Sequence, residues 1–434
     1  MTTVVINHDH TKLPPASSDV VPVQIYGLNG LSRGDISVIG NPIIKPVKRL
    51  GIQLTPASMD FLTIALAVTA ADTFVKRNQA ADGWTREIKI QVPLCDPNPW
   101  LSIQNKLEKA LHFLSGDLWS FELSGGGFEP PSPYLHRDGF HLLKLREIDS
   151  VCLFSGGLDS AIGAIDLISK GRKPLLVSHG YTGDKSKQDA VASRIKGFCK
   201  RFSLNADPRP ANGKTDITMR TRSISFLSFA VVGLDALVQI NQLKKAELYM
   251  PENGFISINV PLTVRRIGSL STRTTHPHFI SSIQEIFSAV GLTTQIINPY
   301  QFQTKGEMIN SCSDRALLAD VIPETISCSN WKRKGQQCGR CVPCLIRRAA
   351  IAKAGMKEPA HYLYQDLKTV LANEKARDDI FALISAIKQA PKRSSRSWIA
   401  DSGPLAPEYI SQYQGVFERG LSEVAEFLKR KRLI

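Results

Sequence analysis

The sequence predicts an α/β protein with a parallel sheet, in a chain of 434 residues. Two observations predict this class. A short apolar strand at 148–154 is followed by a glycine turn and by a helix-compatible run that ends at Ile168. Beyond that run, predicted strands and helices alternate as far as residue 318, which is the pattern of parallel strands joined by helices.

The alternating elements after residue 168 are assigned from the spacing of apolar residues. Strands are predicted at 174–179, 246–250 and 294–297, and helices at 186–202, 222–243 and 304–318. Parallel sheets of this kind bind ligands at the carboxyl ends of their strands. Because Gly156, Gly157, Gly180 and Glu252 follow predicted strands, we expect the site at that edge of the sheet.

The first 140 residues are predicted to form an additional, mixed α/β accessory or recognition domain. Strands are predicted at 20–26, 36–39, 87–92 and 118–123, and helices from Pro56 and over 100–114. The segment 124–133, SGGGFEPPSP, is a linker candidate because three glycines and three prolines favour no regular element. The other predicted units are 148–355, which holds the glycine turn, and a helical extension at 356–434.

The glycine turn reads SGGLDS at 155–160 and joins a strand to a helix. Free backbone N–H groups and the positive end of the helix dipole make such a turn an anion site. Ser155 and Ser160 add hydroxyl donors. Asp159 would repel a bare phosphate, so its presence predicts a Mg²⁺ ion between the carboxylate and the phosphate. An incidental turn with a capping aspartate is the alternative, and the flanking strand and helix argue against it.

Four of the eight cysteines form a C-x9-C-x2-C-x2-C array, namely Cys328, Cys338, Cys341 and Cys344. In a cytoplasmic protein this spacing indicates a metal site rather than disulfides. Four thiolates suit a closed tetrahedral Zn²⁺ site, which is structural because no coordination position stays open. An iron–sulfur cluster is the alternative that the spacing leaves open.

Composition and charge bound the class of protein. The chain is 43% apolar and 21% charged, as in an ordinary globular protein, and no apolar stretch of about 18 residues is apparent. We therefore expect a cytoplasmic protein without a membrane partner. The net charge of +15 suits a polyanionic partner or an anionic substrate such as ATP, although basic clusters at 392–396 and 429–432 supply part of it. Nucleic acid is not the favoured partner, since no aromatic and basic stripe accompanies the charge.

The glycine turn differs in glycine spacing from a Walker A loop and from a dinucleotide fingerprint. It resembles the phosphate loop of the PP-loop ATP pyrophosphatases, which implies a doubly wound parallel sheet and cleavage of ATP between its α and β phosphates. Within that superfamily the chain resembles the 7-cyano-7-deazaguanine synthases, the QueC-like enzymes. The matching pieces are SGGLDS, Arg222 before a helix that contains FLS, TKGE at 304–307, and the cysteine array followed by Arg347 and Arg348.

In that family the carboxylate of 7-carboxy-7-deazaguanine is adenylated, ammonia attacks, and a second ATP completes the nitrile. The resemblance implies that pyrophosphate and Mg²⁺ are held by the phosphate loop, that is by Ser155, Gly156, Gly157, Asp159 and Ser160. It also implies that Arg222 and Lys305 neutralise the developing phosphate charge. The four cysteines would bind zinc.

The chain departs from the housekeeping members, which are about half as long and have nothing like residues 1–140. Two further segments, PENGF at 251–255 and GSLSTRTTHP at 268–277, resemble the QatC-type enzymes of antiviral islands. That resemblance implies attachment of the deazaguanine to an amine of a partner protein. We expect Glu252 or His276 to act as the base for this amine or to bind the purine, and a helix cap is the alternative role for His276. Asn253 and Arg273 are the expected contacts to the purine edge and the carboxylate.

Three other functions stay open. A housekeeping synthase would use ammonia and would need no docking surface. A PP-loop enzyme that modifies tRNA would suit the basic charge and the extra domain, and its affinity for RNA should fall steeply with salt. A degraded nucleotide-binding subunit is disfavoured because Ser155, Asp159, Ser160 and Lys305 are all present.

Overall fold

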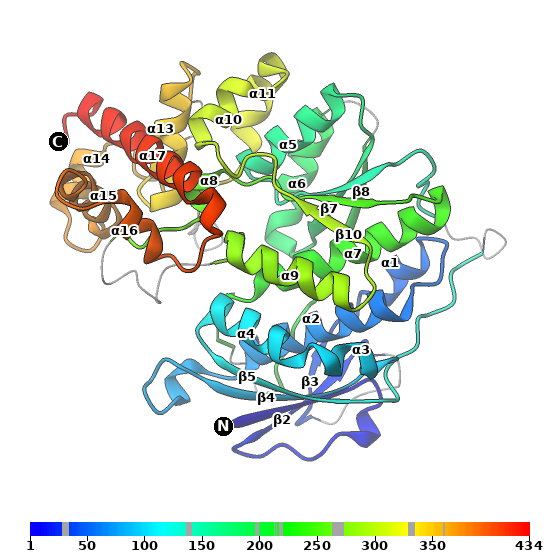
Figure 1. The fold of residues 1–434 in the computed structure, drawn as a ribbon. Coiled ribbons are helices and arrows are strands. Elements are labelled where there is room, and N and C mark those ends of the chain that lie inside the picture. Colours follow the sequence, from blue (N-terminus) through cyan, green and yellow to red (C-terminus); the bar gives the residue numbers. More distant parts are fainter. Residues whose placement is uncertain are drawn as a thin grey trace.

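The computed structural model describes residues 1–27, 34–135, 141–195, 199–211, 213, 215–216, 220–262, 273–328, 335–358 and 361–434. Within these residues, two parallel five-stranded sheets pack against helices, and further helices gather at the C-terminal end (Figure 1). The predicted fold class is confirmed: the chain combines parallel α/β sheets, a four-cysteine cluster and an additional N-terminal α/β region. The predicted domain boundaries stay predictions.

The N-terminal sheet has the strand order β3-β2-β1-β4-β5, and every neighbouring pair is parallel. Its strands are β1 (Thr2–Asn7), β2 (Val20–Ile25), β3 (Ser37–Ile39), β4 (Glu87–Pro93) and β5 (Leu118–Ser124). The associated helices are α1 (Ile44–Lys48), α2 (Pro56–Phe74), α3 (Pro97–Ser102) and α4 (Gln104–Ser115). Four of the five strands are those predicted from the sequence. β1 is the addition, and the predicted helix over 100–114 is divided between α3 and α4.

The second sheet has the order β10-β9-β6-β7-β8 and is also parallel throughout. Its strands are β6 (Ser150–Leu153), β7 (Pro174–His179), β8 (Lys200–Leu204), β9 (Ala246–Tyr249) and β10 (Thr294–Ile297). The helices that connect them are α5 (Leu158–Ser169), α6 (Thr182–Arg194), α7 (Arg222–Asn241), α8 (Gly254–Ser257) and α9 (Pro277–Ala289). The order reverses between β6 and β9, so the segments that follow these two strands meet at a topological switch point.

Two predicted helices are wrong in part. The helix predicted over 186–202 ends at Arg194, and its last residues belong to strand β8. β8 forms because its backbone pairs with β7 and its Phe202 and Leu204 side chains are buried. The spacing of apolar residues cannot predict this pairing with β7. The helix predicted over 304–318 is two helices, α10 (Lys305–Ser311) and α11 (Arg315–Val321), because the Asp314 side chain accepts a hydrogen bond from the Leu317 N–H and starts a new helix.

The remaining helices follow the second sheet. They are α13 (Val342–Lys353), α14 (Leu367–Ala372), α15 (Asp378–Gln389), α16 (Ser395–Ala400) and α17 (Ile410–Arg430). Apolar side chains of α13, α15, α16 and α17 pack into one core cluster with Phe255 and Ile258. The C-terminal helices are therefore joined through buried side chains to the segment that follows β9.

Two described helices, α2 and α7, are long and apolar enough to cross a membrane by length and composition, contrary to the expectation from the sequence. Both are mostly inside the protein, with 83% of an apolar 18-residue stretch of α2 and 72% of that of α7 buried. They lie in one apolar core that continues from the first sheet to the second. A helix that is apolar on all sides is typical of such a core position, so these two helices are a weak indication of a membrane span.

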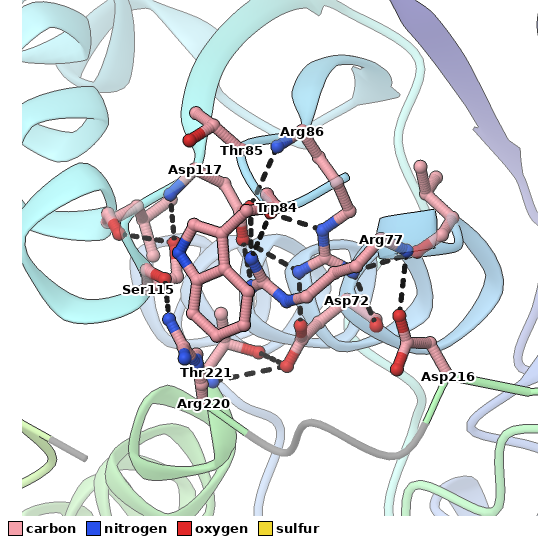
Figure 2. A network of polar contacts seen from close by, with 12 residues as sticks. Asp72, Arg77, Trp84, Thr85, Arg86, Ser115, Asp117, Asp216, Arg220 and Thr221 are labelled. Atoms are coloured by element: carbon pink, nitrogen blue, oxygen red, sulfur yellow. Dashed lines mark hydrogen bonds and ion pairs between the residues drawn. The ribbon is translucent and has the colours of Figure 1, made fainter. Parts of the chain in front are cut away.

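A buried ion cluster stabilises the N-terminal region beside this core (Figure 2). The Arg86 guanidinium lies between two carboxylates, 2.6 Å from Asp72 Oδ1 and 2.7 Å from Asp117 Oδ2. Its Nη1 also donates to the backbone carbonyls of Asp72 and Val75. Arg77 forms a bidentate ion pair with the same Asp117, with Nη1–Oδ1 and Nη2–Oδ2 distances of 2.9 and 2.6 Å. Each buried charge of the cluster thus faces an opposite charge.

The same cluster holds the start of α7. Asp72 Oδ2 accepts hydrogen bonds from the Thr221 N–H at 3.2 Å and from its hydroxyl at 3.0 Å. The Arg220 guanidinium donates to the Ser115 carbonyl at 2.8 Å and lies 4.4 Å from the ring centre of Trp84 (Figure 2). Burial, with the nearby Arg77 charge, lowers the pKa of Arg220 to about 10, so the side chain stays charged at neutral pH. The N-terminal region therefore fixes the two residues that precede Arg222.

Replacing Arg86 with methionine should lower the free energy of unfolding by roughly 3–5 kcal/mol, because Asp72 and Asp117 would lose their shared counter-charge while buried. Chemical denaturation measures this loss. Lys89→Met is the matched control: its pair with Glu122 is exposed, and its loss should cost less than about 1 kcal/mol. Equal destabilisation by the two variants would contradict the importance of the buried cluster.

Candidate active site

The phosphate loop leaves the carboxyl end of β6 and enters α5 at Leu158. Ser155 Oγ accepts a hydrogen bond from the Gly157 N–H at 3.2 Å, and Ser160 Oγ donates to the Gly157 carbonyl at 2.9 Å. Gly156 has a φ of +78°, and a side chain there would meet Gln188. No side chain caps the start of α5, so the first N–H groups of this twelve-residue helix are oriented to bind an anion.

The segment after β9 faces the phosphate loop across the switch point. Asn253 donates to Asp159 Oδ2 through its side-chain amide at 2.7 Å and through its backbone N–H at 3.2 Å. The same amide lies 3.2 Å from Glu252 Oε1. Lys305, the first residue of α10, makes a very short contact with Asp159 Oδ1. Three ionisable groups from three segments of the chain therefore meet at one point.

The two carboxyl groups of this site have opposite pKa shifts. Burial raises the pKa of Asp159, but the charge of Lys305 outweighs this effect and lowers the pKa to about 2. Burial and the charge of Asp159 raise the pKa of Glu252 well above its usual range. The pair thus favours one ionised and one protonated carboxyl group, because a single ammonium group balances only one negative charge.

A cavity of about 170 Å³ lies between the phosphate loop and these groups. Its polar lining includes Ser155, Asp159, Ser160, Glu252, Lys305 and Ser327. Larger cavities of about 440 and 660 Å³ lie elsewhere and are not lined by the phosphate loop. The small cavity therefore combines a helix N-terminus, three serines, a cation and two carboxyl groups, which is a set of groups suited to a polyphosphate with a metal ion.

The cysteine cluster lies next to this cavity, since Ser327 and Pro343, the chain neighbours of Cys328 and Cys344, are among its lining residues. The four Sγ atoms lie within 4.8 Å of one another, and all four residues are buried. Two of the Sγ–Sγ distances, Cys338–Cys344 and Cys341–Cys328, are 4.0 Å, close to the separation of about 3.8 Å for thiolates bound to one tetrahedral metal ion at 2.3 Å. The cluster therefore fits a single metal ion.

Backbone and neighbouring side chains support the cluster. The Cys338 N–H donates to Cys328 Sγ at 3.2 Å, and the Cys341 N–H donates to Cys338 Sγ at 3.3 Å. Arg347 donates to the carbonyls of Ile322 and Thr325, just before the first cysteine. Because Ser327 and Pro343 line the active-site cavity, a metal in the cluster would also hold one side of that cavity in place.

Comparison with known proteins agrees with these features. Residues 274–355 match the family described as "Queuosine biosynthesis protein QueC". The chain is 32% identical over 226 residues to the 7-cyano-7-deazaguanine synthase of Xanthomonas campestris pv. campestris, an alignment that covers 97% of that protein and 49% of this chain. The chain belongs to the 7-cyano-7-deazaguanine synthase (QueC) family.

Other members of the QueC family align to a similar extent. The 7-cyano-7-deazaguanine synthase of Stenotrophomonas maltophilia is 28% identical over 226 residues, with 98% of that protein and 49% of this chain covered. That of Synechococcus elongatus is 26% identical over 234 residues, with 93% of that protein and 48% of this chain covered. The family resemblance thus accounts for nearly the whole of each relative and for about half of this chain.

Arg222, which was expected to neutralise phosphate charge in a QueC-like site, lies at the same edge of the sheet. Its guanidinium is 5.0 Å from the ring centre of Phe226 and 5.8 Å from that of Tyr181. Tyr181 stacks on His179, the last residue of β7. Arg222 is not among the residues that line the phosphate-loop cavity, and its role stays a prediction.

Two of the predicted substrate contacts lie apart from this cavity. Arg273 donates to the Phe113 carbonyl at 3.1 Å, and its guanidinium lies 4.4 Å from the Phe113 ring centre. His276 is buried and caps α9, since its Nδ1 accepts a hydrogen bond from the His278 N–H. Burial lowers the pKa of His276 to about 3, which makes it a weak base. Residues 268–272 of the same polar stretch lie outside the described residues.

Asn253 lies at the site, but its side chain is hydrogen-bonded to other protein groups. Its amide holds Asp159, and its Oδ1 accepts a hydrogen bond from the Ile256 N–H, which caps α8. The expected purine contact stays a prediction. A holding role was missed because the pairing of residues 159 and 253 depends on two strands that are neighbours only in the folded sheet.

Proposed function

We propose that this chain activates the carboxylate of 7-carboxy-7-deazaguanine with ATP and then transfers the activated group to an amine. A carboxylate oxygen attacks the α-phosphorus of ATP, and pyrophosphate leaves as the α–β bond breaks. The amine nitrogen then attacks the acyl carbon, AMP leaves, and a C–N bond has formed. The observation that carries this proposal is the convergence of the phosphate loop, Asp159 and Lys305 on one cavity in a chain of the QueC family.

The roles of the site residues follow from their charge and position. The start of α5 and the hydroxyls of Ser155 and Ser160 would bind the leaving pyrophosphate. Lys305 would balance the negative charge that develops as the α–β bond breaks. Preorganised donors of this kind stabilise the transition state more than the ground state, so their loss should lower the rate constant.

Mg²⁺ suits the two carboxyl groups beside the phosphate loop. Asp159 and Glu252 supply hard oxygen ligands, and their opposite pKa shifts show that a single lysine leaves one of them without a counter-charge. We infer that both carboxylates hold the metal, which when bound would neutralise phosphate charge. The expectation that Glu252 acts instead as the base for the amine stays untested.

The cysteine cluster is proposed to hold structural Zn²⁺. Four buried thiolates within 4.8 Å of one another match a closed tetrahedral site. A four-iron cluster would need thiolates farther apart, because its iron and sulfide atoms lie between them. The short Sγ–Sγ distances therefore favour zinc.

The amine is proposed to belong to a partner protein, with the reaction taking place in the cytoplasm as part of an antiviral defence system. The resemblance to QatC-type enzymes motivates this proposal, and size supports it: about half of the chain lies outside its alignment with QueC-family relatives. A specific protein partner commonly covers about 800 Å² of surface, whereas ammonia needs no docking surface. Dimerisation through the N-terminal region is the competing use of that surface.

Mass spectrometry tests the acceptor. After incubation with ATP, Mg²⁺, 7-carboxy-7-deazaguanine and proteins encoded beside this gene, one partner protein should gain one deazaguanine acyl mass at an amine. The Asp159→Ala variant is the matched control and should produce no adduct. Free nitrile formed efficiently with ammonia, without any modified protein, would instead favour the housekeeping synthase.

A tRNA-modifying enzyme is the alternative that the net charge of +15 motivates. If the proposed function is right, pyrophosphate release should proceed without RNA and should change little when salt is raised from 50 to about 200 mM. A requirement for tRNA that weakens steeply over this range would replace the proposal with the tRNA reaction.

A further inference from the structure

The C-terminal helix α17 contacts the TKGE segment, residues 304–307, at the start of α10. Figure 1 shows α17 beside α13 and α10. Glu423 of α17 accepts a very short hydrogen bond from the Thr304 hydroxyl and a second one, at 3.3 Å, from the Gly306 N–H. One turn earlier in α17, Arg419 pairs with Glu307 at 2.5 Å and donates to the Phe302 carbonyl at 3.0 Å.

These contacts divide the four residues of the TKGE segment into two groups. Thr304, Gly306 and Glu307 are bound by α17, whereas the Lys305 ammonium contacts Asp159 in the phosphate-loop cavity. Lys305 is only 6% exposed. The residues on either side of the lysine are therefore held by a helix that lies beyond the region matched to the QueC family, residues 274–355.

Gly306 leaves room for the Glu423 carboxylate at the start of α10. A Cβ at this position would lie 2.6 Å from Glu423 Oε1 and 2.8 Å from its Cδ, both far inside van der Waals contact. Glu423 itself is 7% exposed. Burial raises the pKa of this carboxyl group, and the hydrogen bonds from Thr304 and Gly306 at the positive end of α10 offset part of that effect.

We infer that Glu423 and Arg419 are positioning residues, which hold the start of α10 so that Lys305 stays on Asp159 and faces the phosphates. This inference rests on the proposed function for its effect on rate. A lysine side chain has four flexible methylenes, so its ammonium group is well placed only if its backbone is fixed. α10 has seven residues and needs such support from outside. The C-terminal extension is then part of the catalytic unit.

Steady-state pyrophosphate release tests the positioning role. Glu423→Ala should lower kcat by about 10- to 100-fold with little change in KM for ATP, since a displaced Lys305 would weaken stabilisation of the transition state. Glu423→Gln should recover part of the rate, because its amide oxygen can still accept from Thr304. Glu426→Ala is the matched control: it lies on the same helix, its pair with Lys353 is exposed, and its kcat should match wild type.

A double variant and a chemical probe separate this inference from general instability and from a wrong function. In a Lys305→Ala background, Glu423→Ala should cause no further loss of rate, because the two residues act through one group. Independently of any catalysis, labelling of Lys305 by a small amine-reactive reagent, read by mass spectrometry, should increase severalfold in folded Glu423→Ala and not in Glu426→Ala. Unchanged labelling together with a wild-type kcat would overturn the inference. Increased labelling in a protein without pyrophosphate release would support the inference and reject the proposed function.

Discussion

Asp159→Ala is expected to reduce pyrophosphate release from ATP and 7-carboxy-7-deazaguanine by about a thousandfold or more. The substitution removes a proposed Mg²⁺ ligand and the partner of Lys305 in one step, and loss of a single preorganised group already costs 10²- to 10³-fold. The rate is measured in a coupled assay of pyrophosphate with ATP, Mg²⁺ and the deazaguanine acid. Wild-type release by this variant would reject the assignment of the phosphate loop.

The protein should stay folded in this experiment. The charge of Asp159 contributes to the raised pKa of Glu252, so its removal should allow Glu252 to ionise and to balance the buried Lys305. Asp149→Ala is the matched control. Asp149 lies just before β6, at the amino end of the strand that leads to the phosphate loop, and it pairs with Arg172. Its replacement should leave pyrophosphate release unchanged.

Cys341→Ser is expected to remove the bound metal and to destabilise the chain by several kcal/mol. Metal analysis of the wild-type protein should find about one zinc per chain. Binding free energy at a structural zinc site is folding free energy, so its loss should appear directly as a lower midpoint of unfolding. Because Ser327 and Pro343 line the cavity, we also expect slower pyrophosphate release at temperatures where the variant is still folded.

Cys95→Ser provides the control for this substitution. Cys95 lies outside the cluster, and its Sγ donates to the Phe128 carbonyl, a hydrogen bond that a serine hydroxyl can also make. Its zinc content and stability should stay close to wild type. An iron signal in the wild-type protein, or a zinc-free Cys341→Ser variant of unchanged stability, would contradict the structural zinc site.

Several parts of the site could be predicted from the sequence because the forces behind them act over a few residues. The phosphate loop is a strand, a glycine turn and a helix start within about 20 consecutive positions, and the structure contains all three in that order. Three of the four cysteines lie within seven residues, so their spacing alone predicts that their thiols converge. Lys305 was assigned through its TKGE motif, and it does contact Asp159.

Other features depended on which strands and helices become neighbours. Strand β8 exists because β7 offers backbone partners, and the sequence of that segment by itself also fits a helix. Arg273 and His276 have polar side chains that would suit a substrate site, yet these side chains contact Phe113 and Ser402, which lie 160 and 126 residues away along the chain. Apolar periodicity carries no information about such distant partners.

The sequence by itself determined the local chemistry of this protein: an anion-binding loop after β6, a cation at the start of α10, and four thiols within one segment, residues 328–344. The tertiary structure decided which residues hold these groups. Asn253 reaches Asp159 across 94 residues of chain, and Glu423 reaches Thr304 across 119. A sequence motif consists of residues that are close along the chain. These supporting contacts join residues that are far apart along the chain, and they form only after the parallel sheet and the C-terminal helices have packed together.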